Sequence, residues 1–231
     1  MDLAIEIQHV IISFIEQDQP TLLQLCLVSR SWYHATTIFL YKAPSFHLYS
    51  QLIRFAQSPH LHLVKTLNMQ MIPHRWRLNM GTALLPILEQ TNHVHRLDFG
   101  LCHQLQMPQL QATTSAYPIQ SLSLHGLGNQ VNDQVVEKWV TDHPDLLELD
   151  LSSCQITDAS IYTIGNHCSK LVDLDLSGCE HISEDGIRHL TRHCQHIRHV
   201  NLQDCFNVVL DDDEVPDRSD DEFWQTDEEA D

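Results

Sequence analysis

The segment "LVDLDLSGCEHISEDGIRHLTRHC" (residues 171–194) repeats, with changes, the segment just before it, "LLELDLSSCQITDASIYTIGNHC" (residues 146–168). Each copy opens with leucine at its first, fourth and sixth positions and has cysteine at its ninth. Self-similarity at a fixed period is typical of stacked repeats, because one unit cannot bury its own apolar face alone. The two segments therefore predict a repeat protein.

The same spacing continues on both sides of these two segments. Further copies begin at Val94, Ile119 and Ile197, and a weaker copy begins at Val64. Between Val94 and Ile197 the first positions are 25, 27, 25 and 26 residues apart. Several apolar positions recur in register over this distance, so the pattern is a strong indication of one continuous array.

Each repeat combines two periodicities. Alternation around Leu174 and Leu176 predicts a short strand with these leucines inward and Asp173 and Asp175 outward. The second half, such as residues 183–193, has a polar N-cap followed by apolar residues at helical spacing. Strands that alternate with helices pair in parallel. The predicted fold is α/β: a short right-handed solenoid with strands on the concave side and helices on the convex side.

The repeat resembles the cysteine-containing class of leucine-rich repeats, which occurs most often in F-box proteins of ubiquitin ligases. The resemblance covers roughly residues 60–209. Residues 42–63 predict an irregular first repeat, with a strand around Phe46 and Leu48 and a helix around Leu52, Ile53 and Phe55. The resemblance implies a scaffold for binding proteins and does not name a ligand.

The first forty residues predict three short helices. Ile7, Val10, Ile11 and Phe14 form one apolar stripe at helical spacing, and Pro20 suits the first turn of a second helix. Helices of about three turns are marginal alone in water, so they must pack on each other or on a partner.

This segment resembles an F-box. The family's opening motif corresponds to residues 3–7 and its Leu-Val-Ser-Arg-x-Trp motif to residues 27–32; Ala4 stands where the family has proline, which we expect to loosen the docking turn. The resemblance implies binding to the Skp-type adaptor of an SCF ubiquitin ligase and, through it, to a cullin-RING ligase. The residues implied in adaptor binding are Leu3, Ala4, Glu6, Ile7, Ile11, Leu22, Leu25, Leu27, Val28, Ser29 and Trp32.

The outward strand residues predict where a protein substrate binds. They form two polar rows that become acidic toward the C-terminal repeats, so we expect the concave face to bind a basic or hydrogen-bonding segment. The expected substrate-binding residues are Arg96, Asp98, Ser123, Glu148, Asp150, Asp173, Asp175, His199 and Asn201. The competing interpretation is that these are solvated strand residues without a ligand.

Several other interpretations stay open. The three N-terminal helices could simply cap the solenoid, and the chain could be a repeat scaffold or regulator outside an SCF complex. Cys154, Cys179 and Cys205 could form a ladder, as a disulfide, a metal site or plain packing; we favour packing. The histidines around His189 and Cys194 could hold zinc in a metal-dependent enzyme. We expect a non-catalytic chain with no metal and no cofactor, because motifs of catalysis or phosphate binding do not occur in it.

Net charge and cysteine content predict the class of partner, an acidic tail and the cellular compartment. The net charge is −18, of which −11 comes from residues 211–231, so we expect no nucleic-acid partner and a disordered acidic tail at residues 210–231. In that tail, Ser219 and Thr226 precede acidic residues and are possible phosphorylation sites. Seven cysteines without a secretion signal favour the cytoplasm or nucleus, and no segment is expected to enter a membrane. The expected domains are an F-box at residues 1–42, a solenoid at residues 43–209 and the tail.

Overall fold

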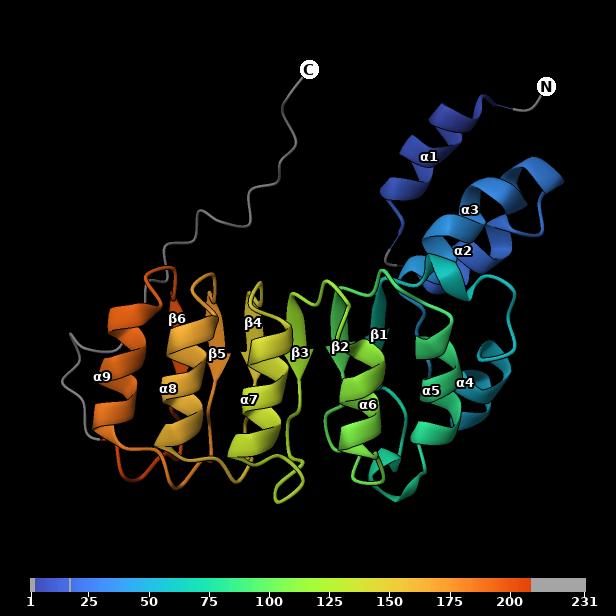
Figure 1. Ribbon diagram of the computed structural model, residues 1–231. Helices are drawn as coiled ribbons and strands as arrows, with labels where there is room; N and C mark the ends of the chain where they lie inside the picture. Colours follow the sequence, from blue (N-terminus) through green and yellow to red (C-terminus); the bar gives the residue numbers. More distant parts are fainter. Residues whose placement is uncertain (1–2, 17, 209–231) are drawn as a thin grey trace.

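The computed structural model describes residues 3–16 and 18–208 (Figure 1). The expected tail, with Ser219 and Thr226, lies outside the described residues. The α-helices are α1 (Ile5–Ser13), α2 (Gln19–Leu25), α3 (Arg30–Lys42), α4 (Tyr49–Phe55), α5 (Gly81–Glu89), α6 (Met107–Thr114), α7 (Asp133–Asp142), α8 (Asp158–His167) and α9 (Glu184–His193). The strands are β1 (Thr66–Asn68), β2 (Arg96–Asp98), β3 (Ser121–Ser123), β4 (Glu148–Asp150), β5 (Asp173–Asp175) and β6 (His199–Asn201), and two 3-10 turns are η1 (Leu61–Leu63) and η2 (Arg75–Arg77).

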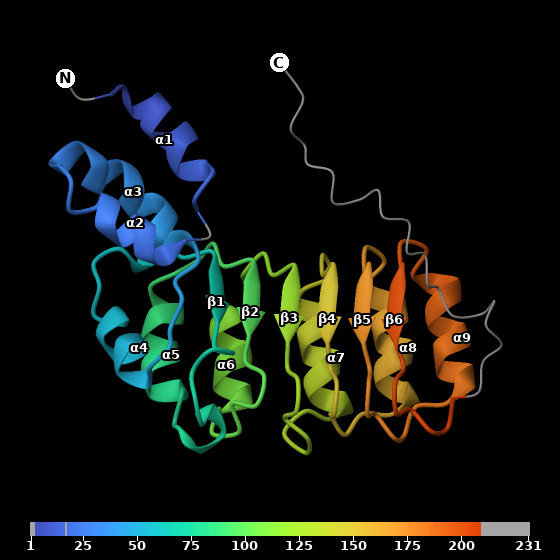
Figure 2. The same ribbon diagram turned by 180° about the vertical axis from the view of Figure 1, so that it is seen from behind.

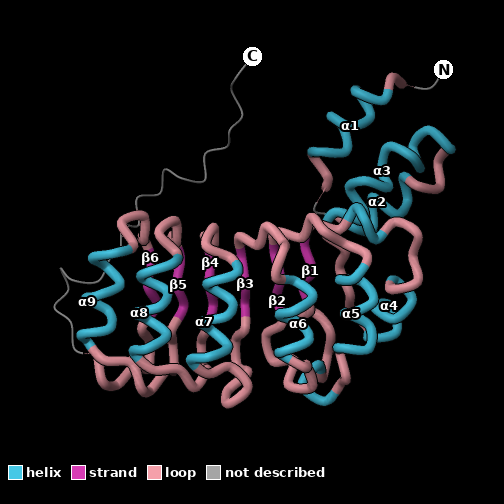
Figure 3. The backbone as a smooth tube through the Cα atoms, in the orientation of Figure 1, coloured by secondary structure: helices cyan, strands magenta, loops and turns pink. Residues whose placement is uncertain are grey.

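The strands form one parallel sheet in the order β1-β2-β3-β4-β5-β6, which confirms the predicted stacking of repeats. Helices α5 to α9 cover one face of this sheet, and the strands line the opposite face (Figures 1 and 2). Strands and helices alternate along the whole array (Figure 3). Since each strand pairs with the next one in the sequence, the solenoid has no crossover between distant repeats.

The core of the solenoid lies between the sheet and the helices. The middle residue of every strand is buried, as the alternating pattern predicts; these residues are Leu67, Leu97, Leu122, Leu149, Leu174 and Val200. The cysteine ladder contributes packing and weak hydrogen bonds. The thiols of Cys154, Cys179 and Cys205 donate to the carbonyl oxygens of Leu124, Leu151 and Leu176, at 3.3, 3.2 and 3.1 Å. All three thiols are free, so the ladder joins successive repeats without disulfides.

The helix N-termini of neighbouring repeats are tied together by aspartates. The carboxylate of Asp133, at the start of α7, accepts hydrogen bonds from the Thr157 amide at 2.9 Å and the Ser160 hydroxyl at 2.6 Å. Asp158, at the start of α8, does the same for the amide and hydroxyl of Ser183, at 2.8 and 2.6 Å. Thr157 and Ser183 stand at the N-cap positions of α8 and α9, and each is itself held by the preceding repeat. The Thr157 hydroxyl also accepts the Ala159 amide at 3.2 Å, whereas the Ser183 side chain makes no capping hydrogen bond.

The N-terminal helices α1, α2 and α3 have a small core of their own, made by Ile12, Leu22 and Ala35. A pair of hydrogen bonds between the Gln8 and Ser31 side chains, at 3.0 and 3.2 Å, joins α1 to α3. This three-helix unit sits at the β1 end of the solenoid (Figure 2). The amide of Lys65, just before β1, donates to the carbonyl of Lys42 at the end of α3, at 2.8 Å.

One predicted element is absent from the described chain. Residues Phe46 and Leu48 do not form the expected strand; they lie in an irregular segment before α4. Phe46 is buried against Phe55, whereas Leu48 is exposed. The sheet of the described residues begins at β1, and the segment with Phe46 and Leu48 does not extend it. None of the helices in the described part of the chain has the length and apolar character needed to cross a membrane.

Candidate functional site

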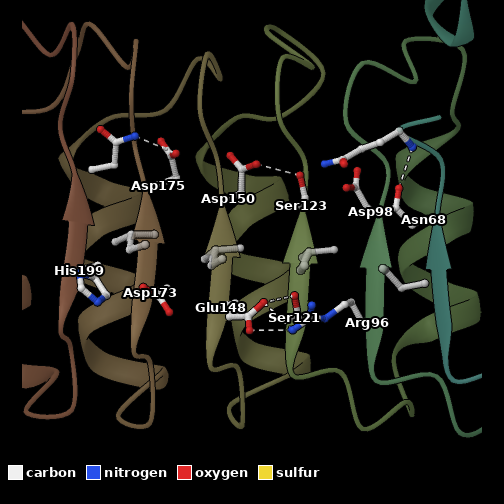
Figure 4. A pocket seen from close by; sticks show the side chains of 16 residues that line it. Asn68, Arg96, Asp98, Ser121, Ser123, Glu148, Asp150, Asp173, Asp175 and His199 are labelled. Atoms are coloured by element: carbon white, nitrogen blue, oxygen red, sulfur yellow. Dashed lines mark hydrogen bonds and ion pairs between the residues drawn. The ribbon is translucent and has the colours of Figure 1, made fainter. Parts of the chain in front are cut away.

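The strand face of the solenoid carries a groove of about 610 Å³ that runs across β1 to β6 (Figure 4). The pairing register of the strands aligns the side chains that line the groove, because each strand presents its first and third residues to the same side of the sheet. All of the expected substrate-binding residues line this groove: Arg96, Asp98, Ser123, Glu148, Asp150, Asp173, Asp175, His199 and Asn201. Whether they contact a substrate remains a prediction.

The third residue of most strands also stabilises the turn that follows the strand. A side-chain oxygen of Asp98, Asp150 and Asp175 accepts the backbone N–H two residues further on, at 2.9, 3.0 and 2.8 Å. Asn68 and Asn201 make the same turn at the two ends of the row. These are Asx turns, in which a short polar side chain replaces a backbone acceptor. One oxygen of each carboxylate is thus committed to the turn that ends the strand.

Several other polar atoms of the groove form hydrogen bonds across the strands. Arg96 on β2 reaches over β3 to Glu148 on β4, with one guanidinium nitrogen at 2.7 and 2.9 Å from the two carboxylate oxygens. The Ser121 hydroxyl donates to the same carboxylate at 2.7 Å. The second oxygen of Asp150 accepts from Ser123 at 2.9 Å (Figure 4). These contacts hold the groove side chains in set positions before any ligand arrives.

The groove is predominantly acidic. Its lining has five carboxylates, those of Asp98, Glu148, Asp150, Asp173 and Asp175, and one arginine. Burial raises the pKa of Asp98 above its ordinary value, against the hydrogen bond from Gly100. Burial also raises the pKa of Asp173, and neighbouring Glu148 adds to this while His199 and Arg198 oppose it. Carboxylates crowded in this way favour a cationic partner, since its charge relieves their mutual repulsion.

A second candidate surface lies on the three-helix unit. Of the residues implied in adaptor binding, Leu3, Ala4, Glu6, Ile7, Ile11, Leu27 and Val28 are exposed. Leu27 and Val28 are 80% and 64% exposed, in the turn that joins α2 to α3. These seven residues are therefore available to a partner.

Four of the residues implied in adaptor binding have a structural position instead. Leu22 is fully buried in the three-helix core, so its side chain cannot contact an adaptor as the resemblance implied. Leu25 and Trp32 are half-buried and pack against that core. The Ser29 hydroxyl accepts the Trp32 amide at 3.3 Å and caps α3. The motif at residues 27–32 thus also shapes the turn that displays Leu27 and Val28.

The sequence interpretation omitted several residues of these surfaces. Ile5 on α1 and Leu23 on α2 are exposed apolar side chains, and Val10 and Phe14 of the apolar stripe are exposed as well but were not among the residues implied in adaptor binding. Gln70 lines the groove beyond Asn68, whose side chain accepts the Gln70 amide at 2.7 Å. The available signal was the recurrence of Asn or Asp at the third position of five strands, which is typical of Asx turns.

The described residues do not contain a group of three or more His, Cys, Asp or Glu side chains placed to hold a metal ion. His189 and His193 stack on each other with ring centroids 3.9 Å apart. Cys194 is buried, and its thiol donates to the Cys168 carbonyl at 3.4 Å. Burial raises the pKa of Cys194 to about 11. The zinc hypothesis for this region lacks a third ligand in the described chain.

Comparison with known proteins bears on the repeats. A family model described as "Leucine Rich repeat" matches residues 143–165 and 167–190. The chain contains leucine-rich repeats. These two matched segments include two of the six groove strands, β4 and β5, and most of α8 and α9.

Known relatives are distant and longer. The "Antagonist of mitotic exit network protein 1" of Candida glabrata is 24% identical over 163 residues, covering 69% of this chain and 31% of its own length. Thus the chain spans less than a third of this curated relative. A chain of the yeast Rad7 and Elc1 complex overlaps 70% of this chain and 56% of its own, at 14% identity and a TM-score of 0.42. A chain of the TLR13-ssRNA13 complex overlaps 64% of this chain and 27% of its own, at 14% identity and a TM-score of 0.35.

Proposed function

We propose that this chain is the substrate-recognition subunit of an SCF-type E3 ubiquitin ligase, acting in ubiquitin-dependent proteasomal degradation in the cytoplasm or nucleus. Residues 1–42 are the F-box that binds a Skp-type adaptor, and residues 43–209 are the leucine-rich-repeat solenoid that binds a protein substrate. The acidic segment at 210–231 is a tail. The chain itself is non-catalytic and needs no cofactor.

The apolar stripe of α1 carries the proposal. Ile7, Val10, Ile11 and Phe14 face solvent, with exposed fractions of 50%, 57%, 40% and 79%. Gln8 and Ile12 are the fully buried residues of that helix. A helix that turns its polar Gln8 inward and an apolar stripe outward leaves a surface that is unfavourable in water. A partner that covers the stripe would remove this cost, and the resemblance to an F-box supports an adaptor as that partner.

Alanine at position 4, where the F-box motif has proline, is compatible with adaptor binding. Ala4 is the N-cap of α1, with φ of −58° and ψ of 146°. Proline holds φ near −65°, so alanine already adopts the backbone angle that the family's proline imposes. The difference from the family therefore affects the conformational entropy of the free chain more than the shape of the docking turn.

The groove supports the second half of the proposal. Its side chains are pre-positioned by Asx turns and by the Arg96–Glu148 ion pair, so a bound segment meets a surface that needs little reorganisation. In such a ligase the receptor contributes proximity: it holds the substrate while another subunit transfers ubiquitin. This role needs a rigid link between the two surfaces, and the hydrogen bond between Lys65 and Lys42 is part of that link.

Adaptor binding is tested with the purified full chain and a purified Skp-type adaptor. Leu27→Glu and Phe14→Glu place a charge on exposed positions of the three-helix unit, so folding should be retained while binding falls by at least about tenfold. Phe206→Glu is the matched control, because Phe206 is 77% exposed at the opposite end of the solenoid. Calorimetry that detects no adaptor binding, or equal binding by all three variants, would overturn the proposal.

The second candidate function is a non-catalytic repeat scaffold or regulator that acts outside an SCF complex. The similarity to a protein named as an antagonist favours it, although that protein is much longer. The two candidates differ in one measurement. A chain that binds a partner through the groove and does not bind the adaptor fits the scaffold, whereas a receptor must bind both.

A further inference from the structure

A second cavity, of about 280 Å³, opens beside the acidic groove at the end nearest the three-helix unit. It shares Arg96, Ser121 and Glu148 with the groove, so the two cavities are contiguous. Its other lining residues are Lys42, Lys65, Thr66, His95, Gln120 and Leu147. We call it the junction pocket. It combines the end of α3 with the residues that precede successive strands.

A backbone ladder brings the basic residues of the junction pocket together. The Lys65 amide donates to the Lys42 carbonyl, the His95 amide to the Lys65 carbonyl, and the Gln120 amide to the His95 carbonyl, each at 2.8 Å. Neighbouring rungs of such a ladder lie about 4.8 Å apart. The basic side chains therefore start from adjacent positions on a rigid edge, and their proximity does not depend on a flexible loop.

The charge of the junction pocket is opposite to that of the rest of the chain. Lys42, Lys65 and Arg96 contribute three positive charges against the single carboxylate of Glu148, a net +2 with His95 neutral. The whole chain has 13 basic and 31 acidic side chains. Lys42 is paired with Glu16 and Arg96 with Glu148, whereas Lys65 has no ion-pair partner among the described residues. The pocket thus keeps at least one uncompensated cation.

We propose that the junction pocket binds an anionic oxygen group, carboxylate or phosphoryl, carried by the same protein segment that occupies the acidic groove. This inference rests on the proposed role of the groove in substrate binding and specifies the substrate class. The ligand has a negative group near the three-helix unit and a positive group near β5. The two cavities then fix its charge order along the solenoid, since the reverse placement would set like charges against each other.

The separation of the two charges follows from strand spacing. Lys65 directly precedes β1, whereas Asp173 and Asp175 lie at β5, four strands away. Four spacings of about 4.8 Å give about 19 Å. An extended segment advances about 3.3 Å per residue, so the negative and positive residues should be about six positions apart.

The test uses the full chain and an array of fluorescent decapeptides. Each peptide has one arginine and, at a distance of two to seven positions, glutamate, phosphoserine or alanine. We expect glutamate or phosphoserine at a spacing of about six to bind about tenfold more tightly than alanine. Lys65→Glu and Lys65→Gln should remove this preference, because the Lys65 side chain is exposed and only its backbone serves the fold. Lys138→Glu, on α7 and outside both cavities, is the matched control.

The outcomes separate this inference from the proposed function. Tighter binding of phosphoserine peptides than of glutamate peptides identifies the anionic group as phosphoryl. Equal binding of the two shows that a carboxylate is sufficient. Either result supports anion binding in the junction pocket. Selection of arginine without any effect of the anion, or an anion preference that survives Lys65→Glu, overturns the pocket and leaves the groove proposal standing. If none of the peptides binds, both the junction pocket and the groove proposal are overturned. Adaptor binding by the three-helix unit is measured in the separate experiment described above.

Discussion

The solenoid and the three-helix unit use their leucines differently. In the solenoid, Leu149 and Leu174 at the strand centres are 3% and 2% exposed. In the three-helix unit, Leu27 and Leu23 are 80% and 53% exposed. Both regions consist of short elements, so element length does not explain the contrast. The difference is that each inner repeat has a neighbour on both sides, whereas the helical unit is too small to enclose its own apolar residues.

This comparison separates two kinds of apolar pattern. Residues that recur at the repeat period belong to a shared core, and their loss is a loss of stability. Under the proposed function, the apolar residues that the small helical unit leaves in water belong to a contact surface, and their loss should affect binding with little effect on folding. Four predictions examine this distinction, beginning with the largest effect.

Truncation of a strand leucine should be costly. Leu174→Ala removes a buried side chain between two repeats, and we expect it to lower the free energy of unfolding by about 2–5 kcal/mol. Leu27→Ala, at an 80% exposed position, should change it by less than about 0.5 kcal/mol. Urea unfolding followed by circular dichroism measures both. Equal losses in the two variants would contradict the division into core and contact surface.

The aspartates that tie helices together should stabilise the solenoid in a pH-dependent way. Burial opposes ionisation of Asp133, but hydrogen bonds from Ser160 and Thr157 outweigh it and lower its pKa. The folded chain therefore binds fewer protons than the unfolded chain just below pH 4, and this stabilisation is lost as the pH falls through the lowered pKa. Asp133→Asn should cost about 1–2 kcal/mol at pH 7. Unfolding midpoints that differ as much at pH 3 as at pH 7 would argue against this cause.

Buried His143 should make the solenoid sensitive to mild acid. Burial lowers its pKa, against the hydrogen bond to the Tyr117 carbonyl at 3.1 Å. The unfolded chain then binds more protons below about pH 6.5, so stability falls as the pH decreases, by at most about 1.4 kcal/mol per pH unit for one group. His143→Asn should reduce the loss of stability between pH 7 and pH 5.5 relative to the parent. Parallel losses in parent and variant would exclude His143 as the source.

The smallest expected effect concerns the entry to α1. Ala4→Pro should raise the stability of the three-helix unit by about 0.4–1 kcal/mol, because proline restricts the unfolded chain to an angle that Ala4 already adopts. Adaptor affinity should increase slightly or stay the same. Amide hydrogen exchange of α1 is the measurement. Faster exchange in the variant would show that the alanine backbone is not equivalent to proline at this position.

Much of the fold was predictable because its determinants are local. The alternation at Leu174 and Leu176 and the repeat spacing predict the strands, their parallel order and the two rows of the groove, which the register confirms. The strand expected at Phe46 and Leu48 was wrong, since a strand also needs a partner. Short-range pattern identifies residues that can form a strand, and pairing decides whether they do.

Side-chain roles in the groove and on the three-helix unit could not be predicted from the sequence. The spacing places Asp150 and Asp175 on the outer face, but only the structure shows that one oxygen of each is committed to an Asx turn. The stripe on α1 was visible as a pattern, yet its direction was not, because either face of an isolated helix can pack. Leu22 is buried and its neighbour Leu23 is exposed because of where α1 and α3 pack against α2, which the sequence pattern of α2 does not specify.

By itself, the sequence determined the repeat period, the parallel sheet and the residues on each side of it, because strand alternation and repeat spacing are properties of neighbouring positions in one chain. The tertiary structure alone decided that the α1 stripe faces solvent and that Lys42, Lys65 and His95 meet beside the groove. These features join segments that are far apart in the sequence, so they exist only once the helices and strands have packed.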